Sequence, residues 1–276
     1  MHKKLLITGS GGFIGQEVLK KISGFKISRF KGDLRNISDI ESNISSDVIG
    51  VLNLAARTSG SFEQLYEVNV TGTENLLSVV KDKCKNLEFF IQIGSASEYG
   101  FSKLPISEVS PMTPLNDYGK TKLKQTQLIV EAFNNTDVSV TVLRLFNVCG
   151  RDMSDKMLPV RLKKMFETDG LGVEISNKDS SRDWIDVRDV AELVIKFLEI
   201  RKPGLEIFNI GRGVAVSNLE LIKAFERFTN KTKIIDETYD KADHSVANIS
   251  KLKKMFASWT PRYDLKDMIN YLYETD

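Results

Sequence analysis

A glycine-rich turn joins the first apolar strand of this sequence to its first helix, and few folds accommodate such a turn. Leu5, Leu6 and Ile7 precede the segment TGSGGFIG at 8–15, and apolar residues at helical spacing follow it. Glycine permits a positive φ, lets the backbone approach a pyrophosphate, and lets the helix pack close to the strand. The helix N-terminus would offer unpaired N–H groups and partial positive charge to the phosphates. The segment therefore predicts a dinucleotide-binding turn, since a purely structural turn would not need its GxxGxxG spacing.

Strand and helix patterns alternate along the first half of the chain. Short apolar or β-branched runs predict strands at 5–8, 26–30, 48–54, 89–93 and 138–145. Longer stretches with apolar residues three or four apart predict helices at 13–22, 62–80 and 117–133. Nearly continuous apolar strands alternating with helices are typical of a parallel sheet covered on both faces. The predicted fold class is α/β, with a Rossmann-type doubly wound parallel sheet.

The alternation becomes less regular after about residue 150. Helices are predicted at 158–166, 187–199 and 218–228, and short strands at 173–175 and 207–210, with more loop between them. We interpret residues 1–150 as a dinucleotide-binding domain. Residues 151–276 are interpreted as a smaller, partly discontinuous α/β lobe that binds substrate.

Composition excludes several kinds of partner. The 276 residues suffice for a three-layer core, and the net charge of +2 is spread without a basic block, so no nucleic acid partner is expected. The first apolar run is too short for a signal peptide or a membrane span, which predicts a cytoplasmic location and no membrane partner. Cys84 and Cys149 form no CxxC pattern and are expected to be reduced thiols. His2 and His244 are the only histidines, so no metal site is expected.

The end of the second predicted strand bears on the choice of cofactor. An acidic residue there would hydrogen-bond the ribose hydroxyls of NAD(H), but Ser28 and Arg29 occupy the place. A hydroxyl and a guanidinium suit a 2′-phosphate, so NADP(H) is favoured over NAD(H). The alternative is that Arg29 is an ordinary surface charge. Asp33, which precedes Leu34, could accept from the adenine amine or cap a helix that begins after Asn36.

Seven motifs in order make the chain resemble the extended short-chain dehydrogenases/reductases. They are TGSGGFIG at 8–15, NLAA at 53–56, NVTGTENLL at 69–77, GSASEYG at 94–100, YGKTK at 118–122, RLFNVCG at 144–150 and RDWIDVRDV at 182–190. The resemblance covers nearly the whole chain. Within that class it is similar to the NAD(P)-dependent epimerase/dehydratase family, which implies a nicotinamide cofactor and a nucleotide-sugar substrate.

Tyr118 and Lys122 form a YxxxK pair whose side chains lie on one face of a helix. A phenol with a pKa of about 10 is a poor acid–base catalyst at neutral pH, and a nearby ammonium would lower that pKa. Tyr118 would then exchange a proton with a sugar oxygen while hydride moves to or from the nicotinamide. The resemblance adds Ser95, at the end of a strand, as the hydroxyl that hydrogen-bonds the reacting carbonyl. The alternative is an ordinary amphipathic-helix tyrosine and lysine.

The resemblance also implies binding roles. The expected cofactor-binding residues are Gly9, Gly11, Gly12, Phe13, Ile14, Gly15, Ser28, Arg29, Asp33, Leu34, Leu54, Ala55, Ala56, Asn69, Tyr118 and Lys122. The expected substrate-binding residues are Ser97, Asn147 and Arg182. Asn69 could instead be a helix-interior polar residue, and Arg182 could be a surface partner of Asp183 or Asp186.

Departures from the family pattern narrow the reaction. Dehydratases of the family carry an Asp-Glu pair where this chain has Ala96 and Ser97, so elimination of water is not expected. Ser97 also replaces the cysteine of the epimerase-reductases that invert carbons beside a ketone. Hydride transfer at one carbon remains, and sequences with GSxSEYG resemble reductases of 4-keto-6-deoxy sugar nucleotides.

Three functions are consistent with the sequence. The leading hypothesis is an NADPH-dependent reductase of a nucleotide-linked 4-keto-6-deoxyhexose in deoxysugar or surface polysaccharide biosynthesis, with Tyr118 as proton donor. The second is an NAD-dependent nucleotide-sugar 4-epimerase, against which Ser28 and Arg29 weigh. The third is an NAD(P)-sensing protein without catalysis. The predicted helices at 62–80 and 117–133 resemble those of a dimeric four-helix bundle in the family, which implies a homodimer.

Overall fold

The computed structural model describes residues 4–168, 172–175, 177–237 and 241–274, and the chain divides into two compact units. Unit 1 comprises Met1–Gly100, Ser110–Leu145 and Ala191–Phe208, and unit 2 comprises Phe101–Val109, Phe146–Val190 and Asn209–Asp276. The division differs from a single boundary at residue 150. Residues 191–208 return to unit 1 because they supply an edge strand of its sheet. Residues 101–109 belong to unit 2 because Ile106 forms a parallel bridge with Ala247.

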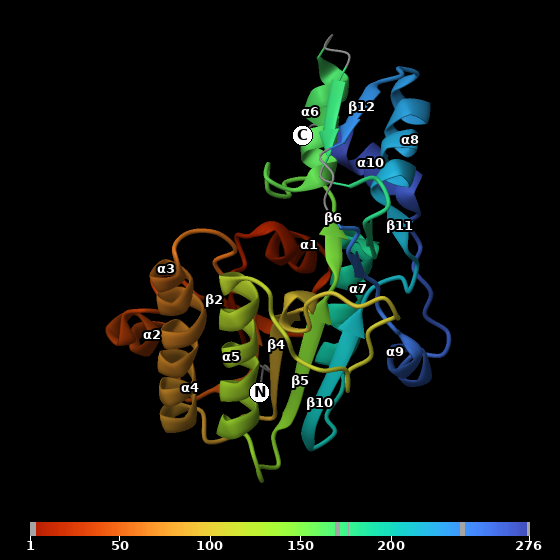
Figure 1. Ribbon diagram of the computed structural model, residues 1–276. Coiled ribbons are helices and arrows are strands. Elements are labelled where there is room, and N and C mark those ends of the chain that lie inside the picture. Colours follow the sequence, from red (N-terminus) through yellow and green to blue (C-terminus); the bar gives the residue numbers. More distant parts are fainter. Residues whose placement is uncertain (1–3, 169–171, 176, 238–240, 275–276) are drawn as a thin grey trace. The chain divides into compact units, whose positions relative to one another are not determined.

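Unit 1 is built on a six-stranded sheet in the order β10-β5-β4-β3-β1-β2 (Figure 1). Its strands are β1 (Lys4–Thr8), β2 (Lys26–Arg29), β3 (Val48–Asn53), β4 (Phe89–Ser95), β5 (Ser139–Leu145) and β10 (Gly204–Ile210). Its helices are α1 (Phe13–Lys21), α2 (Ile37–Asn43), α3 (Phe62–Tyr66), α4 (Gly72–Lys83), α5 (Asp117–Ala132) and most of α7 (Val187–Leu198), which begins in unit 2.

The order of the strands makes the sheet doubly wound. Both β2 and β3 pair with β1 in parallel, and β4 and β5 continue outward from β3 in parallel. From β1 the sheet extends to β2 on one side and through β3, β4 and β5 on the other. The strand order therefore reverses between β1 and β3, and the switch point lies at their carboxyl ends. Ligands of open α/β sheets bind at such a switch point. The predicted Rossmann-type α/β fold is confirmed, while the predicted strand at 207–210 begins earlier, at Gly204.

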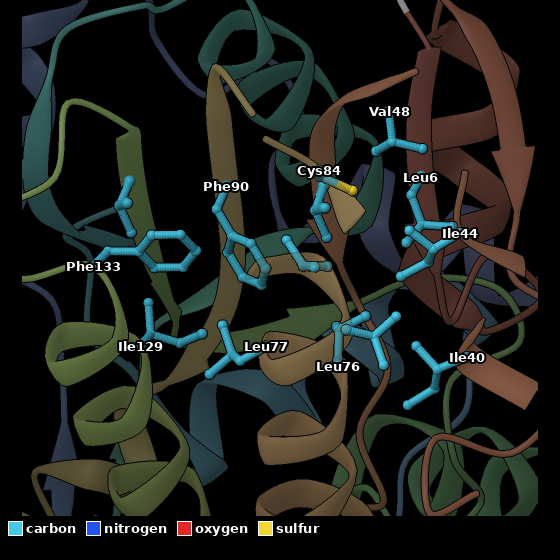
Figure 2. Close-up of a cluster of buried hydrophobic side chains, with 14 of the residues drawn as sticks. Leu6, Ile40, Ile44, Val48, Leu76, Leu77, Cys84, Phe90, Ile129 and Phe133 are labelled. Carbon is cyan, nitrogen blue, oxygen red and sulfur yellow. The ribbon is translucent and has the colours of Figure 1, made fainter. Parts of the chain in front are cut away.

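A cluster of buried apolar side chains lies between the sheet and helices α2, α4 and α5 (Figure 2). Leu6 of β1 and Phe90 of β4 belong to it, and Ile129 reaches toward the sheet from α5. Leu5 and Ile7 point to the opposite face of β1, because successive side chains alternate in a strand, and they are equally buried. Burial on both faces explains why the strands read as continuous apolar runs.

The segment predicted as one helix at 62–80 has a π-helical turn in it. Helix α3 is followed directly by this turn, η1 (Glu67–Thr71), and then by α4. Such a turn adds a residue to one turn of the helix, which apolar spacing alone does not reveal. Single π turns inside α-helices often occur at functional sites, and η1 carries the fully buried Asn69.

Unit 2 is a small α/β lobe. Its strands are β6 (Asn147–Cys149) paired with β9 (Trp184–Asp186), β7 (Gly172–Ile175) paired with β12 (Ile234–Glu237), and β8 (Ser181–Arg182) between β11 (Val216–Ser217) and β13 (His244–Ser245). Helices α6 (Leu158–Glu167), α8 (Asn218–Thr229) and α10 (Leu265–Tyr273) pack together, and α9 (Ser250–Met255) buries Leu252. The rings of Phe166 and Phe225 stack with their centroids 5.7 Å apart between α6 and α8.

No helix in the described ranges is long and apolar enough to cross a membrane. Cys84 and Cys149 are buried free thiols. Burial raises the pKa of Cys84 to about 11, which makes it a poor nucleophile at neutral pH.

Candidate active site

The glycine-rich turn lies at the switch point of the sheet. Gly9 has a φ of +64°, and the Gly12 N–H donates to its carbonyl at 3.0 Å. A Cβ on Gly9 would lie 2.6 Å from Ala55 N, and one on Gly15 would lie 2.4 Å from the Gly9 carbonyl oxygen. Both positions therefore require glycine. The predicted cofactor residues Leu54 and Ala55 follow β3 and contact this turn directly.

The start of α1 fits a phosphate group. Gly12 is its N-cap, the first turn has no acidic residue, and among the described residues no side chain caps it. The N–H groups of the first turn, including those of Phe13 and Ile14, have no partner within the helix. No described atom comes within 4 Å of a Cβ built on Gly11. Free N–H groups, a positive helix end and open space are what a pyrophosphate requires, so the residues present fit a dinucleotide cofactor.

Arg29, the last residue of β2, lies beside the turn. Its Nε donates to Ser10 Oγ at 3.1 Å, while Ser28 before it is half-buried. This hydrogen bond draws a guanidinium and a hydroxyl together, the two groups that suit a 2′-phosphate. Arg29 is exposed, so it is a surface charge with one hydrogen bond to Ser10, and its role in reading a 2′-phosphate stays a prediction.

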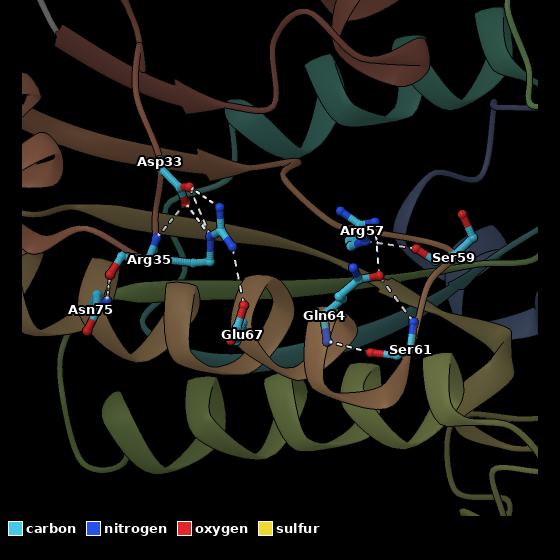
Figure 3. Close-up of polar contacts among 8 residues, drawn as sticks. All are labelled: Asp33, Arg35, Arg57, Ser59, Ser61, Gln64, Glu67 and Asn75. Atoms are coloured by element: carbon cyan, nitrogen blue, oxygen red, sulfur yellow. Dashed lines mark hydrogen bonds and ion pairs between the residues drawn. The ribbon is translucent and has the colours of Figure 1, made fainter.

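Asp33 is held by a neighbouring arginine (Figure 3). The Arg35 guanidinium bonds both carboxylate oxygens, with Nη2 at 2.5 Å from Oδ2, and also pairs with Glu67 at 3.2 Å. Arg35 holds the pKa of Asp33 below its usual value. Helix α2 is capped by the Asn36 side chain, so the alternative in which Asp33 is the cap is wrong. The Leu34 side chain is buried in the apolar cluster, which leaves only its backbone to face a cofactor.

Asn69 fastens two segments of unit 1 together. Its Oδ1 accepts from Arg57 N at 2.8 Å, and its Nδ2 donates to Arg57 O at 2.9 Å and Thr121 Oγ1 at 3.1 Å. The Arg57 side chain in turn bonds the Ser59 carbonyl at 2.8 Å (Figure 3). Asn69 thus joins the loop after β3, which includes the exposed Ala56, to the residue before Lys122. Asn69 is fully buried and bonded within the protein, as the alternative of a helix-interior polar residue expects, and its contact with a cofactor stays a prediction.

A chain of buried polar side chains crosses the sheet beneath these loops. Thr8 Oγ1 donates to Asn53 Oδ1, and Asn53 Nδ2 donates to Gln92 Oε1 at 2.7 Å. Gln92 Nε2 donates to the Ile93 carbonyl at 2.8 Å. All three side chains are fully buried, and a buried amide must be hydrogen-bonded to be tolerated. The chain links the strand of the glycine-rich turn to the strand of Ser95.

Ser95 and Tyr118 lie together. Ser95 ends β4, Tyr118 is in the first turn of α5, and their side chains are hydrogen-bonded. Asn116 caps α5 by accepting from Gly119 N at 2.8 Å. A Cβ on Gly119 would lie 2.3 Å from the Ser97 carbonyl oxygen, so the helix start packs tightly on the turn after β4. Burial raises the pKa of Tyr118 to about 12, and the bond to Ser95 opposes this.

Lys122 is buried on the same helix. Its ammonium donates to the Ile93 carbonyl at 2.6 Å and to Gln125 Oε1, and the Gln125 amide donates to Thr73 Oγ1 at 2.7 Å. Burial lowers the pKa of Lys122 to about 8. The expectation that Lys122 lowers the pKa of Tyr118 is not met here. The ammonium is bound to Ile93 and Gln125, so burial dominates and raises the pKa of the phenol.

The expected substrate residues are divided between the units. Ser97 belongs to unit 1, where its N–H donates to Ser95 Oγ at 3.1 Å. Asn147 and Arg182 belong to unit 2. Arg182 pairs with Asp243 at 2.6 Å and lies over the Phe101 ring at 4.8 Å. Arg182 therefore forms an ion pair, as the alternative expected, but its partner is Asp243 and not Asp183 or Asp186.

Two acidic neighbours of Arg182 in sequence are used elsewhere. Asp183 accepts from Arg212 N and Gly213 N, both at 2.8 Å. Asp186 pairs with Arg188 at 2.7 Å. These contacts explain why neither carboxylate binds Arg182.

Glu98 and Gln125 are site residues that the sequence did not single out. Glu98 accepts from Ser95 N at 2.8 Å, and Gln125 holds the Lys122 ammonium. A signal existed for Glu98, because Ser95-x-x-Glu98 is a capping box. Gln125 has no local signal, since its role depends on how α5 lies against β4.

Solved structures share the fold of this chain. The RMD protein of Pseudomonas aeruginosa, solved with NADPH, superposes with a TM-score of 0.87 at 22% identity, over 98% of this chain and 96% of that one. A UDP-glucuronic acid 4-epimerase variant of Bacillus cereus, solved with NAD, gives a TM-score of 0.86 at 25% identity, over 98% of both chains.

Curated relatives match over most of their length. A UDP-glucose 4-epimerase of Lactobacillus helveticus is 25% identical, over 96% of this chain and 94% of its own length. Another, of Mycoplasma genitalium, is 28% identical, over 98% and 88%. Residues 5–211 match the model of the NAD dependent epimerase/dehydratase family. That span contains the glycine-rich turn, the Ser95–Tyr118 pair and Lys122, and the chain belongs to the NAD dependent epimerase/dehydratase family.

Proposed function

We propose that this chain is a nucleotide-sugar 4-epimerase, which oxidises and re-reduces one carbon of its substrate with a nicotinamide dinucleotide. The observation that carries the proposal is the hydrogen-bonded pair of Ser95 and Tyr118 beside the switch point, with Lys122 on the same helix. The UDP-glucose 4-epimerases among the relatives support it. These relatives favour a 4-epimerase more strongly than Ser28 and Arg29 favour an NADPH-dependent reductase.

Tyr118 and Ser95 act on the same sugar oxygen. A nicotinamide dinucleotide, when bound, would accept hydride from the sugar carbon and return it to the opposite face of that carbon, which inverts its configuration. Tyr118 takes the proton of the hydroxyl as the carbon is oxidised and returns it as the carbon is reduced. Ser95 hydrogen-bonds the oxygen throughout, and Lys122 lies one turn further along the same helix face. Ala96 and Ser97 offer no carboxylate base there, so a dehydratase reaction is not proposed.

The second candidate is an NADPH-dependent reductase of a nucleotide-linked 4-keto-6-deoxyhexose. Two observations favour it specifically. Arg29 and Ser10 lie together beside the glycine-rich turn, where the two groups would suit a 2′-phosphate. The raised pKa of Tyr118 favours a reductase, which starts from the protonated phenol, whereas an epimerase must first take a proton from the sugar hydroxyl.

One pair of assays separates the candidates. The purified protein is first denatured and any released dinucleotide identified, and UDP-glucose and UDP-galactose are tested for interconversion without added cofactor. NADPH is then mixed with the protein and a panel of nucleotide 4-keto-6-deoxysugars, and the cofactor absorbance is followed. Interconversion with co-purifying NAD supports the epimerase. Rapid NADPH consumption without interconversion supports the reductase and overturns the proposal.

Arg29→Asp is expected to reverse the choice of cofactor. The change removes a guanidinium from the edge of the turn and adds a carboxylate that repels a 2′-phosphate and accepts from ribose hydroxyls, so the NADPH Kd rises about tenfold to hundredfold while that for NADH falls. Lys26→Asp is the matched control, because Lys26 is the exposed first residue of the same strand, β2. Fluorescence titration of cofactor-free protein measures both constants. Equal NADPH affinity in Arg29→Asp and wild type would show that Arg29 does not read the phosphate.

We also propose a homodimer formed through α3, α4 and α5. Phe62 and Tyr66 of α3 and Val130 of α5 are apolar residues exposed by 41%, 37% and 40%. Light scattering is expected to give the mass of two chains at micromolar concentration. Phe62→Asp with Tyr66→Asp is expected to give one chain, since charge is costly at a buried apolar contact. A wild-type mass of one chain contradicts the proposal.

A further inference from the structure

A buried carboxylate lies directly behind Ser95. Glu98 has a fully buried side chain, and each of its oxygens has a partner. Oε1 accepts from Ser95 N at 2.8 Å, and Oε2 accepts from Arg144 Nε at 2.8 Å. A carboxylate in such a place is costly unless it is paired and hydrogen-bonded, and here it is both.

Arg144 also makes two contacts with Tyr99. Arg144 Nη1 donates to the Tyr99 hydroxyl at 2.7 Å, and the guanidinium lies 4.7 Å from the centroid of the Tyr99 ring. Its side chain is only 3% exposed. Because Arg144 is buried and bonded to Tyr99, its ion pair fixes the position of the Glu98 carboxylate.

The backbone leaves room for this ion pair. Gly94 of β4 lies opposite Arg144 of β5 in the sheet register. A Cβ on Gly94 would lie 2.9 Å from Glu98 Oε1 and 3.1 Å from Arg144 Cγ. Glycine at this position is thus explained by the carboxylate that lies over it.

The ion pair closes the turn that orients Ser95. Residues Ala96–Glu98 form a short 3-10 helix that begins with a capping box. In this box the Ser95 side chain accepts from a backbone N–H of the turn, and the Glu98 side chain accepts from Ser95 N. Within it Ser95 Oγ accepts from Ser97 N at 3.1 Å, and the same hydroxyl bonds Tyr118. The groups whose charge faces Glu98 are Arg144 of β5 and Lys122 and Tyr118 of α5. The turn, the hydroxyl and the phenol therefore form one connected unit.

We propose that Glu98, clamped by Arg144, is a positioning residue that holds the Ser95 hydroxyl toward Tyr118 through the Ser95 N–H. The inference rests on the proposed function, in which that hydroxyl contacts the reacting oxygen. Glu98 itself does not contact the substrate. Its effect is on kcat, and substrate KM and cofactor Kd are expected to stay near their wild-type values.

The test replaces the ion pair in two ways. Glu98→Met with Arg144→Met removes both charges at similar volume, so the fold is kept, since such replacements of buried ion pairs are often tolerated, but Ser95 N loses its acceptor. Glu98→Gln with Arg144→Gln removes the same charges and keeps an amide oxygen for Ser95 N. The first variant is expected to lose on the order of a hundredfold in kcat, and the second to stay within about tenfold of wild type.

A matched control lies at the other end of the same strand. Glu88 pairs with Arg201 at 3.3 Å, and that guanidinium lies 3.7 Å from the centroid of the Phe89 ring. Glu88→Met with Arg201→Met makes the same chemical change away from Ser95, and its kcat is expected to match wild type. Circular dichroism and cofactor titration check that each variant is folded.

The amide hydrogen exchange of Ser95 provides a readout without substrate. Exchange is expected to accelerate in the methionine pair and to stay slow in the glutamine pair and in the Glu88 control. A folded methionine pair with wild-type kcat and wild-type exchange overturns the inference. A glutamine pair as slow in turnover as the methionine pair overturns it also, because charge would then matter and the acceptor would not. Wild-type protein inactive on every nucleotide sugar refutes the proposed function alone, and the exchange rates still decide the role of Glu98.

Discussion

Tyr118→Phe is expected to lower kcat by about three orders of magnitude, in the range measured for loss of a general acid–base group. Phenylalanine fills the same space at the start of α5, and Asn116 still caps the helix. What is lost is the proton that passes between Tyr118 and the sugar oxygen, together with the hydrogen bond to Ser95. Steady-state kinetics measures the change, with the substrate on which the assays described under Proposed function find activity. Cofactor Kd and the free energy of unfolding are expected to stay close to wild type.

Tyr66→Phe is the matched control for this prediction. It deletes the same hydroxyl from an exposed tyrosine of α3, whose ring lies 5.7 Å from that of Phe62. Its kcat is expected to equal that of wild type. If Tyr118→Phe retained kcat within about tenfold, Tyr118 would not be the acid–base group, and proton transfer would have to come from another side chain.

The parts of the site that the sequence predicts are those whose geometry is local. The glycine-rich turn is defined by residues a few positions apart, and the steric reason for Gly15, its contact with Gly9 and Ser10, lies in the turn itself. The steric reason for Gly9 is contact with Leu54 and Ala55, which the sequence does not show. Tyr118 and Lys122 share a helix face because they are four residues apart. The role of Ser95 was expected from the family resemblance of the segment GSASEYG at 94–100. For the turn and the YxxxK pair, a short segment and one secondary-structure period carry the information.

Contacts that depend on strand register could not be predicted from the sequence. Asn53 bonds Gln92 because they are direct partners between β3 and β4. Arg144 reaches Glu98 because it lies opposite Gly94 across β4 and β5. Register is set by the packing of the whole sheet, so neither pair can be read from sequence spacing.

The environment of charges was also not predictable. The expectation for Lys122 took the phenol of Tyr118 and the cofactor as its neighbours, but Gln125 and the Ile93 carbonyl accept hydrogen bonds from its ammonium. Asp33 likewise finds Arg35 two residues on and is not available as a helix cap. Both outcomes depend on which partner lies closest in the folded chain, and several candidates in the sequence were chemically equivalent.

Two glycines of the turn after β1 allow its structural and cofactor-binding roles to be separated. Gly15→Ala is expected to damage the fold itself, because the new Cβ would lie 2.4 Å from the Gly9 carbonyl oxygen and 2.7 Å from Ser10 Cα. Both neighbours are backbone and cannot rotate away, so α1 must move off the turn. We expect the free energy of unfolding to fall by about 1–3 kcal/mol, as overpacked sites do. Cofactor affinity is expected to fall on the order of a hundredfold, since the N–H groups at the helix start shift with it.

Gly11→Ala is the matched partner of that variant. Around a Cβ at this position the described part of the chain leaves at least 4 Å free, and the backbone there is not in the left-handed region. The free energy of unfolding without cofactor is therefore expected to stay within about 0.5 kcal/mol of wild type, or to rise slightly because alanine restricts the unfolded chain. If the open space is where the pyrophosphate lies, the methyl group occupies it, and cofactor affinity falls on the order of tenfold or more.

Denaturant unfolding without cofactor and fluorescence titration with NADH and NADPH give both quantities for both variants. A stable Gly11→Ala protein with weakened binding assigns the open space to the cofactor, because nothing in the protein itself would have been disturbed. Unchanged affinity in Gly11→Ala would mean that the phosphates approach the helix from another side. In that case loss of binding in Gly15→Ala would reflect only the displaced helix, and the turn would owe its glycines to close packing between strand and helix.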